Sequence, residues 1–382
     1  EIIAVYQRLN DPNQTQESIN QITEQLTQFY QNPESLLILL QLYLQNDNKS
    51  IRISCTTGFK SILNSLEKWA FYQQNGQSEN IKQLVLHLLS AEKDPYLFLN
   101  AIYSFHVIIK AEYITWQEYL GLIQTFSANQ AQIYFSLLMA NALTHAKLDD
   151  DYMGNVWDFL CQLAATGLSS GDDKSIEQSA LLIQNLFDYD TFQSHLLELL
   201  SSLFQSIIEL MNRKSDKFGH VLDCFNESIL TSEFTFPNRD EILQQIFSVI
   251  ASDNFDIEQR FLLFETPLDI VLTDREGNMD EMAATFFEIY FTLTCVSFDI
   301  ELTLDQQENL KTMLQHFDKM SEAFDDSVLY QLLRAKGTGS NSPGEIVAYG
   351  QTLISLITKS PHLIIHDLSS LIEYGFACFE IP

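Results

Sequence analysis

Apolar residues recur at helical spacing in short stretches that follow one another along almost the whole chain. Between Ile19 and Tyr30 they fall at intervals of three, four, three and one, which is one stripe of an amphipathic helix. Pro33 interrupts this stripe and suits the first turn of a second helix over 34–44, where a missing N–H is tolerated. Because each stripe ends after a few turns and needs a neighbour to cover it, the pattern predicts an all-α fold of paired helices.

The same alternation predicts helices along the rest of the chain. Helices are expected at about 51–69, 79–90, 95–110 and 115–126, and pairs at about 130–146 with 151–165, 174–187 with 191–212, 216–231 with 238–251, 256–273 with 279–296, and 344–358 with 361–378. This makes about eight antiparallel pairs of about 47 residues, which is the repeat length of HEAT arrays. We therefore expect a HEAT-repeat, right-handed superhelical solenoid. An irregular segment is expected near 300–343, with an acidic stretch and a loop from Lys336 to Pro343.

Composition argues against several other classes of protein. The 382 residues include only 13 glycines and 8 prolines, too few turn-forming residues for a β-sandwich or a barrel. The 51 acidic and 21 basic residues give a net charge of −30, which disfavours nucleic-acid phosphates and favours a basic protein partner. No apolar run approaches the roughly 18 residues of a membrane span, so we expect no membrane contact.

The cysteines and the chain ends bear on where the protein works. The five cysteines lie far apart and form no CxxC pair, which predicts buried thiols without disulfides in a reducing compartment. The sequence begins without methionine and stops after Ile381-Pro382, as expected of a trimmed or truncated chain. The absence of a targeting signal is therefore weak evidence.

The sequence contains no motif that is typical of catalysis. His362 and His366 are four residues apart, but the zinc-protease pattern needs Glu after the first histidine and the chain has Leu363 there. Two surface histidines are the better interpretation. Gly337-x-Gly339 lacks a third glycine and a preceding strand, so it is expected to be a loop. We expect no enzyme, no cofactor and no metal.

The order of segments near the N-terminus resembles a known family. The helix INQITEQLTQFYQNPESL is followed by LLQLYLQNDNKSIRISCTTGFKSIL, and the match continues through Trp69, ENIKQLVLHLL, the Asp94-Pro95 turn and Trp116-x-x-Tyr-Leu. This order is similar to the N-terminal domain of importin-β (karyopherin-β) nuclear transport receptors. EILQQIFSVIASDNFDIEQRFLLFETPLDIVL resembles a middle repeat of the large importins that carry histones and ribosomal proteins. The resemblance implies an N-terminal domain over 1–128 with HEAT repeats 1–3, and about repeats 4–8 over 129–382, continuous with it.

The resemblance also implies a function and partners. Ran GTPase in its GTP form would bind the concave face of the first repeats, with Lys60 and Asn64 as candidate contacts. Basic cargo proteins would occupy the rest of the concave face, and FG repeats of nucleoporins would enter slots on the convex face. Such a receptor shuttles between cytoplasm and nucleus and is expected to be a monomer. The alternative is a HEAT-repeat scaffold or adaptor of a cytoplasmic complex.

Several prominent residues have structural interpretations. Arg52 is expected to pair with a carboxylate of a neighbouring repeat, and Lys60 is open to a second interpretation as a side chain lying over apolar surface. Trp69, Trp116 and Trp157 recur at intervals of 47 and 41 residues. This recurrence indicates anchors of helix packing rather than a ligand cage.

Overall fold

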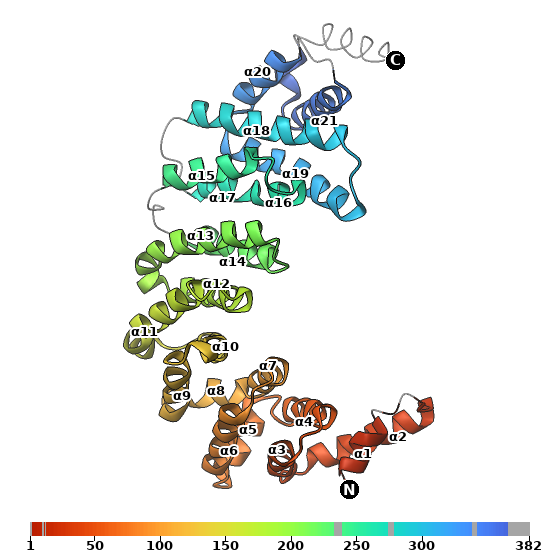
Figure 1. The fold of residues 1–382 in the computed structure, drawn as a ribbon, viewed down its shortest axis with the longest axis vertical. Coiled ribbons are helices and arrows are strands. Elements are labelled where there is room, and N and C mark those ends of the chain that lie inside the picture. The colour runs from red at the N-terminus through yellow and green to blue at the C-terminus, as the bar shows by residue number, and fades with distance from the viewer. Residues whose placement is uncertain are drawn as a thin grey trace. The chain divides into compact units, whose positions relative to one another are not determined.

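The computed structural model describes residues 2–9, 11, 13–232, 239–273, 279–337 and 342–365, without the side chain of Asp299. Every regular element within these ranges is a helix, so the predicted all-α fold is confirmed (Figure 1). The chain divides into two compact units, unit 1 (Glu1–Thr191) and unit 2 (Phe192–Pro382). The domain boundary implied near residue 128 lies inside unit 1 and stays a prediction about the repeats. None of the described helices is both long and apolar enough to cross a membrane.

Unit 1 contains two layers of helices, which we name the A layer and the B layer. The A layer consists of α3 (Ser35–Gln45), α6 (Ser78–Ala91), α9 (Gln117–Ser127) and α11 (Asp150–Leu168). The B layer consists of α2 (Gln16–Gln31), α4 (Lys49–Ile62), α7 (Pro95–Ser104), α10 (Ile133–Thr144) and α12 (Asp173–Phe187). Each B-layer helix packs on the next one, while α3 packs on α6, α6 packs on α9, and α11 packs on α10 and α12. Consecutive helices thus alternate between layers, as in a HEAT-type array.

The helix pairs begin one helix earlier than the sequence pattern suggested. The first helix, α1 (Ile2–Leu9), was not predicted; it packs on α2 and α4. It therefore forms the first pair with α2, and α3 pairs with α4, whereas the sequence pattern paired 19–30 with 34–44. A helix of only eight residues is too short to show a repeated stripe, and this is why it was missed.

Two long predicted helices are each broken into two. The helix predicted over 51–69 is α4 followed by α5 (Leu66–Gln74), because Ser65 adopts an extended conformation and accepts a hydrogen bond from the Lys68 backbone N–H at 3.4 Å. The side chain of Ser65 thus caps a new helix. The helix predicted over 95–110 is α7 followed by α8 (His106–Glu112), with the break at the fully buried Phe105. The short helices α5 and α8 pack on each other beside the two layers.

Unit 2 repeats the two-layer arrangement. Its A layer contains α13 (Leu197–Arg213), α15 (Arg239–Ala251), α18 (Met279–Asp299) and α20 (Asp326–Lys336). Its B layer contains α14 (Phe218–Thr231), the consecutive helices α16 (Ile257–Leu263) and α17 (Glu265–Thr273), α19 (Leu304–Ala323) and α21 (Pro343–Lys359). Within the B layer, α14 packs on α17, α17 on α19, and α19 on α21.

The segment near 300–343, expected to be irregular, contains two helices. Residues 304–336 form α19 and α20, which are as regular as the other helices. Thr303 and Gln306 form a capping box at the start of α19, and the Asp325 side chain accepts a hydrogen bond from the Ser327 backbone N–H at 2.7 Å at the start of α20. Thr303 and Asp325 therefore act as helix caps. The Gly339 part of the expected loop lies outside the described residues.

Three tryptophans anchor the packing of unit 1. Trp69 and Trp116 are each 1% exposed and Trp157 is 4% exposed, so their predicted role as helix-packing anchors is confirmed. Cys55 and Cys224 are buried, Cys161 and Cys295 are half-buried, and none of these four forms a disulfide. Burial raises the pKa of the Cys55 thiol to about 12, which keeps it protonated and unreactive. Cys378 lies outside the described residues.

A glycine inside α4 lets three side chains approach the helix backbone. A Cβ atom at Gly58 would lie 2.5 Å from Leu39 Cδ1, and 3.1 Å from both Tyr30 Cε1 and the Tyr6 hydroxyl oxygen. Leu39 and Tyr6 are both fully buried, so they have little room to move. Gly58 therefore permits the close contact of α4 with α1, α2 and α3.

Replacing this glycine tests the close approach. We expect Gly58→Ala to lower the free energy of unfolding by about 1–3 kcal/mol through overpacking, although alanine favours a helix by about 1 kcal/mol. Gly121→Ala in α9 is the matched control, because a Cβ there meets nothing within 4 Å. It should raise the stability by about 1 kcal/mol. Urea unfolding followed by circular dichroism measures both, and equal gains would contradict the packing argument.

Candidate functional site

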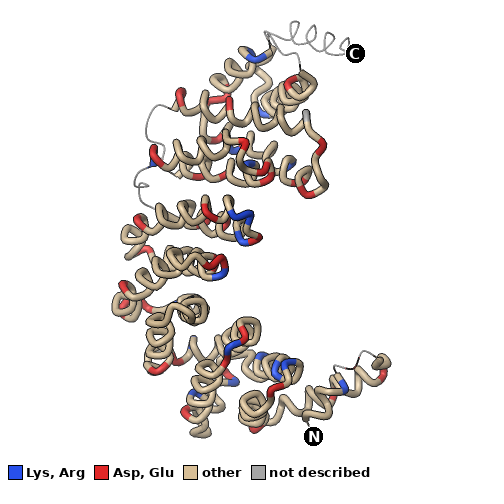
Figure 2. Tube along the Cα trace, in the orientation of Figure 1, with Lys and Arg blue, Asp and Glu red and all other residues tan. Residues whose placement is uncertain are grey.

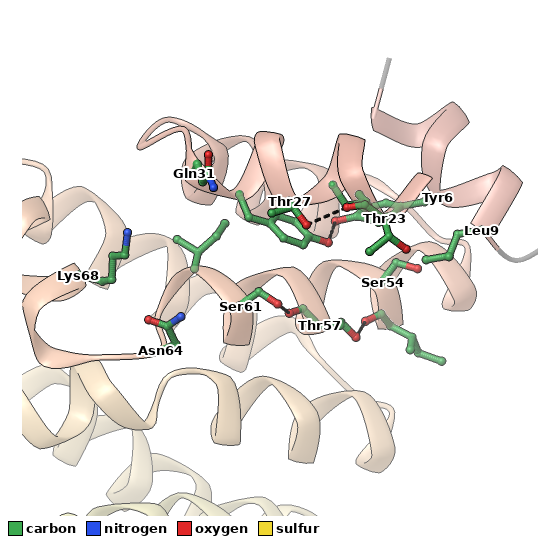
Figure 3. A pocket seen from close by; sticks show the side chains of 14 residues that line it. Tyr6, Leu9, Thr23, Thr27, Gln31, Ser54, Thr57, Ser61, Asn64 and Lys68 are labelled. Carbon is green, nitrogen blue, oxygen red and sulfur yellow. Dashed lines mark hydrogen bonds between the residues drawn. The ribbon is translucent and has the colours of Figure 1, made fainter. Parts of the chain in front are cut away.

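A groove runs along the B layer of unit 1 between the first two helix pairs. Its volume is about 630 Å3, and α1, α2 and α4 form its walls (Figure 3). The helix α4 contributes Ile53, Thr57 and Ser61, which recur every four residues and therefore share one face, and Asn64 follows in the turn after the helix. Lys68, in α5, continues this line beyond the helix break.

The hydroxyl groups of the groove donate their protons to their own helices. Thr27 Oγ1 donates to the Thr23 carbonyl oxygen at 2.8 Å, Thr57 Oγ1 to the Ile53 carbonyl at 3.2 Å, and Ser61 Oγ to the Thr57 carbonyl at 3.0 Å (Figure 3). A hydroxyl carries one proton and two lone pairs, so a group bonded in this way can only accept from a ligand. The groove therefore presents hydrogen-bond acceptors to a partner that carries N–H or O–H donors.

The apolar part of the groove rests on a pair of tyrosines. The hydroxyl groups of Tyr6 and Tyr30 lie 3.1 Å apart and form a hydrogen bond. Burial, together with this hydrogen bond, raises the pKa of Tyr6 far above its ordinary value. Both tyrosines are therefore neutral, and with Leu9 and Leu26 they form an uncharged floor.

Charge is nearly absent from this groove. No Asp or Glu is among the described residues that line it, and Lys68 is the charged residue among them. Lys68 is exposed and forms no ion pair with any described residue. In a chain of net charge −30, this leaves a locally neutral surface with a cation at one end.

The two predicted contacts occupy different positions. Asn64 is exposed and lines the groove, at the same end as Lys68 (Figure 3). Lys60 is exposed on α4 beside the groove, does not line it, and has no ion-pair partner among the described residues. Their roles stay predictions. Lys68 and Thr57 were not predicted as groove residues. The sequence signal for Thr57 was the polar side chain of Ser61 four residues later, on the same face of α4.

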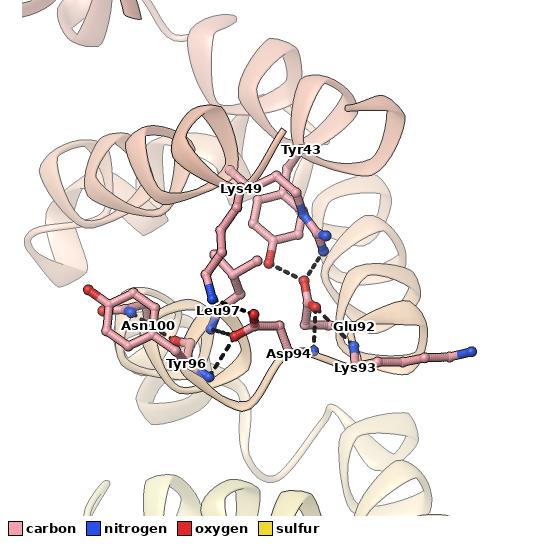
Figure 4. Close-up of polar contacts among 9 residues, drawn as sticks. Tyr43, Lys49, Glu92, Lys93, Asp94, Tyr96, Leu97 and Asn100 are labelled. Atoms are coloured by element: carbon pink, nitrogen blue, oxygen red, sulfur yellow. Dashed lines mark hydrogen bonds and ion pairs between the residues drawn. The ribbon is translucent and has the colours of Figure 1, made fainter. Parts of the chain in front are cut away.

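A buried carboxylate connects the second and third helix pairs. Arg52 of α4 forms an ion pair with Glu92, whose side chain is 2% exposed, so the predicted pairing of Arg52 with a neighbouring repeat is confirmed. The Tyr43 hydroxyl donates to Glu92 at 2.5 Å, and the backbone N–H groups of Lys93 and Asp94 donate to it at 2.9 and 2.8 Å (Figure 4). Every lone-pair direction of the carboxylate is thus engaged, as a buried charge requires.

A second buried carboxylate, at the end of α8, connects that helix to α5 and α6. Glu112 accepts hydrogen bonds from Trp69 Nε1 at 2.9 Å, Gln73 Nε2 at 2.6 Å and Thr115 Oγ1 at 2.7 Å, and Lys82 Nζ lies 3.5 Å away. Burial raises the pKa of the Glu112 carboxyl, but these hydrogen bonds and the lysine together hold it below its ordinary value. The charged form is therefore the one that stabilises the fold.

Removing the charge of Glu112 should show this dependence. We expect Glu112→Gln to lower the free energy of unfolding by about 1–3 kcal/mol at pH 7. Because the pKa is depressed in the folded state, the stabilisation is present above the unfolded value of about 4.3 and is lost as the pH falls through the folded value. The difference between wild type and variant should therefore shrink below about pH 4. Urea unfolding between pH 7 and 3.5 measures it, with the exposed Glu118→Gln as control; a difference independent of pH would contradict the charged state.

The remaining predicted features bear less on function. His362 is exposed in the short 3-10 helix η3 (Pro361–Leu363), and His366 lies outside the described residues. In the part of the chain that the structure describes, no three His, Cys, Asp or Glu side chains are grouped to hold a metal ion.

Comparison with known proteins identifies the fold. No family model matches the chain, and no curated protein matches it by sequence. Solved structures of Kap121p match all of it at 13% identity: Kap121p bound to Nup53p has a TM-score of 0.80, the karyopherin Kap121p bound to the SUMO protease Ulp1p has 0.78, and Kap121p bound to RanGTP has 0.74. The fold is that of a karyopherin.

This karyopherin fold confirms the predicted HEAT-repeat class and agrees with the resemblance to the importin-β family. The three matches cover 100% of this chain and 38–39% of Kap121p, so the chain spans about two fifths of the length of that protein.

Proposed function

We propose that this chain acts as a nuclear transport receptor of the importin type, which works by binding rather than by catalysis. In this proposal GTP-bound Ran binds the B layer of unit 1, basic cargo binds the B layer of unit 2, and FG nucleoporins bind the A layer. The receptor would act as a monomer and shuttle between cytoplasm and nucleus. The observation that supports it most is the match of the whole chain to Kap121p, including the structure bound to RanGTP.

The groove of unit 1 supports a contact with Ran. It combines an uncharged floor with hydroxyl acceptors, and Asn64 and Lys68 lie together at one end (Figure 3). A folded GTPase surface that carries a carboxylate could pair with Lys68 or Lys60, neither of which has an ion-pair partner among the described residues. A rigid array can select the GTP state by shape, because the γ-phosphate orders the switch loops of a GTPase.

The charge distribution supports a basic cargo. Unit 1 has 21 acidic and 10 basic residues, and unit 2 has 30 acidic and 11 basic residues (Figure 2). In the B layer of unit 2, Asp223 and Glu227 of α14 lie near Glu265 of α17. Burial raises the pKa of Asp223, and the carboxylates of Glu265 and Glu227 raise it further, while His220 partly offsets this rise. Lysine or arginine side chains of a cargo would relieve this repulsion.

The A layer of unit 2 supports an apolar ligand. A cleft of about 350 Å3 lies between α15 and α18, with Leu243, Phe247 and Met282 among its lining residues. The ring of Phe247 packs edge-on against Phe286 with centroids 5.0 Å apart, so its position is fixed. Such a slot between two helices of one layer suits a single aromatic side chain of an FG repeat.

Binding of Ran gives the decisive test. We expect the protein to bind Ran loaded with GTP and not Ran loaded with GDP, and we expect Lys60→Glu and Lys68→Glu each to weaken that binding by at least about 1 kcal/mol. Lys311→Glu, an exposed lysine of unit 2, is the matched control and should leave the affinity unchanged. Melting temperatures should stay close to wild type, because exposed substitutions change stability by less than about 0.5 kcal/mol.

The outcomes of this experiment separate the proposals. An unchanged affinity in both variants would leave Lys60 and Lys68 as solvated lysines, with Ran bound elsewhere. Equal binding of both nucleotide states, or no binding, would overturn the transport-receptor proposal and favour the scaffold.

Basic cargo binding should depend on salt. We expect a Lys/Arg-rich peptide to lose at least about tenfold in affinity between about 50 and 300 mM salt, because screening weakens exposed charge pairs. The double variant Asp223→Asn, Glu227→Gln should bind more weakly than Glu198→Gln, Glu241→Gln, which removes two exposed charges from the A layer of the same unit. Isothermal titration measures all three proteins. An affinity that does not depend on salt, or an equal loss of affinity in both double variants, would rule out this part of the B layer as the cargo surface.

A further inference from the structure

A second cleft lies against α2, away from the groove of Figure 3. Its volume is about 830 Å3, and α1, α2 and α3 form its walls. The α2 residues of this cleft, Gln25 and Gln28, come two positions after Thr23 and Leu26 of the groove. Two residues turn a helix by about 200°, so the cleft and the groove use opposite faces of α2.

The floor of the cleft is apolar and open. Ile2, Val5, Phe29 and Ile38 line it, and Ile38 is 41% exposed although it belongs to a helix of the A layer. An exposed isoleucine beside a half-buried phenylalanine leaves apolar surface for a ligand to cover.

The rim of the cleft suits a peptide backbone. Gln25, Gln28 and Asn32 are exposed and end in carboxamide groups, each of which can donate and accept hydrogen bonds. A peptide main chain offers the complementary N–H and C=O groups at every residue. An apolar floor with a carboxamide rim therefore matches an extended peptide with one large side chain pointing inward.

The charge of the cleft differs from that of the rest of the chain. Among the described residues that line it there is no Asp or Glu, and Arg8 is the charged residue. Arg8 Nη2 donates to Ser18 Oγ at a long distance of 3.4 Å, and Arg8 has no ion-pair partner among the described residues. An exposed guanidinium at the edge of a cleft whose described lining holds no acid attracts a carboxylate, for which its fork of donors is well suited.

We propose that this cleft binds a short peptide segment with one large aliphatic or aromatic side chain in the apolar floor and an Asp or Glu beside it, paired with Arg8. Such a ligand differs from basic cargo by its charge and from Ran by its place, so the inference goes beyond the proposed function. A single anchor and one ion pair give a weak, transient contact.

A synthetic peptide tests the proposal directly. The probe is fluorescein-labelled Gly-Ser-Gly-Ser-Phe-Asp-Glu-Gly-Ser-Gly-Ser, titrated with the full chain and followed by fluorescence anisotropy. Two companion peptides carry Ala in place of Phe, or Lys-Lys in place of Asp-Glu. We expect both companions to bind at least about fivefold more weakly, because one loses the anchor and the other places like charge against Arg8.

Variants of the protein locate the binding. We expect Ile38→Ser to weaken the probe at least about fivefold by removing floor surface. Arg8→Ala should weaken the probe while removing the discrimination between the Asp-Glu and Lys-Lys peptides. Ile354→Ser and Lys311→Ala are the matched controls, since Ile354 is 60% exposed on α21 and Lys311 is exposed on α19. Melting temperatures verify that all four variants fold.

Each alternative occupant gives a different result. Equal effects of Ile38→Ser and Ile354→Ser, or equal affinity for the Asp-Glu and Lys-Lys peptides, would overturn the proposal. Self-association of the protein at about 50 µM that Ile38→Ser abolishes would assign the cleft to a second copy of the chain and would overturn it as well. Ran binding serves as the separate readout: a chain that binds Ran but not the probe loses this inference and keeps the proposed function.

Discussion

Buried carboxylates that join consecutive helix pairs are the constraint on which unit 1 depends. Glu92 lies 40 residues after its partner Arg52, and Glu112 lies 43 residues after its partner Trp69. In a repeat array each pair touches only its neighbours, so one joint fixes the angle at which the next pair begins. Since a buried charge is stable only in the geometry that satisfies it, each joint fixes both the distance and the direction between pairs.

Charge is distributed unevenly along the chain, and the net charge alone does not show this. Among the described residues of unit 2, Lys319, Lys336 and Lys359 all pair with carboxylates across helix boundaries. In unit 1, by contrast, Lys60 and Lys68 have no ion-pair partner among the described residues, and they lie beside a groove whose described lining holds no acid. The described lining of this groove is thus a neutral to weakly cationic surface within an acidic protein. Different stretches of one array can therefore attract ligands of different charge.

The sequence was sufficient to predict the class of fold, because stripes of apolar residues with helical spacing have few other solutions. It also predicted the role of Arg52 and of the three tryptophans, since their recurrence matched the repeat. It could not predict the eight-residue helix α1, which shifts every pair by one place. Nor could it predict the helix break at Ser65, because a serine inside an apolar pattern is both a tolerated helix residue and a cap. Lys68 joins the groove only through that break, so tertiary structure was needed to find it.

The helix α2 separates the groove from the second cleft, because it contributes one face to each. It forms a wall of the groove with Thr27 and a wall of the second cleft with Gln28, which are adjacent in sequence. A ligand that displaced or rotated α2 on one side would change the width of the space on the other. Such linkage is reciprocal, so each ligand would alter the affinity of the other by the same factor. A helix only four to five turns long would then act as a shared partition, through which two partners that never touch could compete or cooperate.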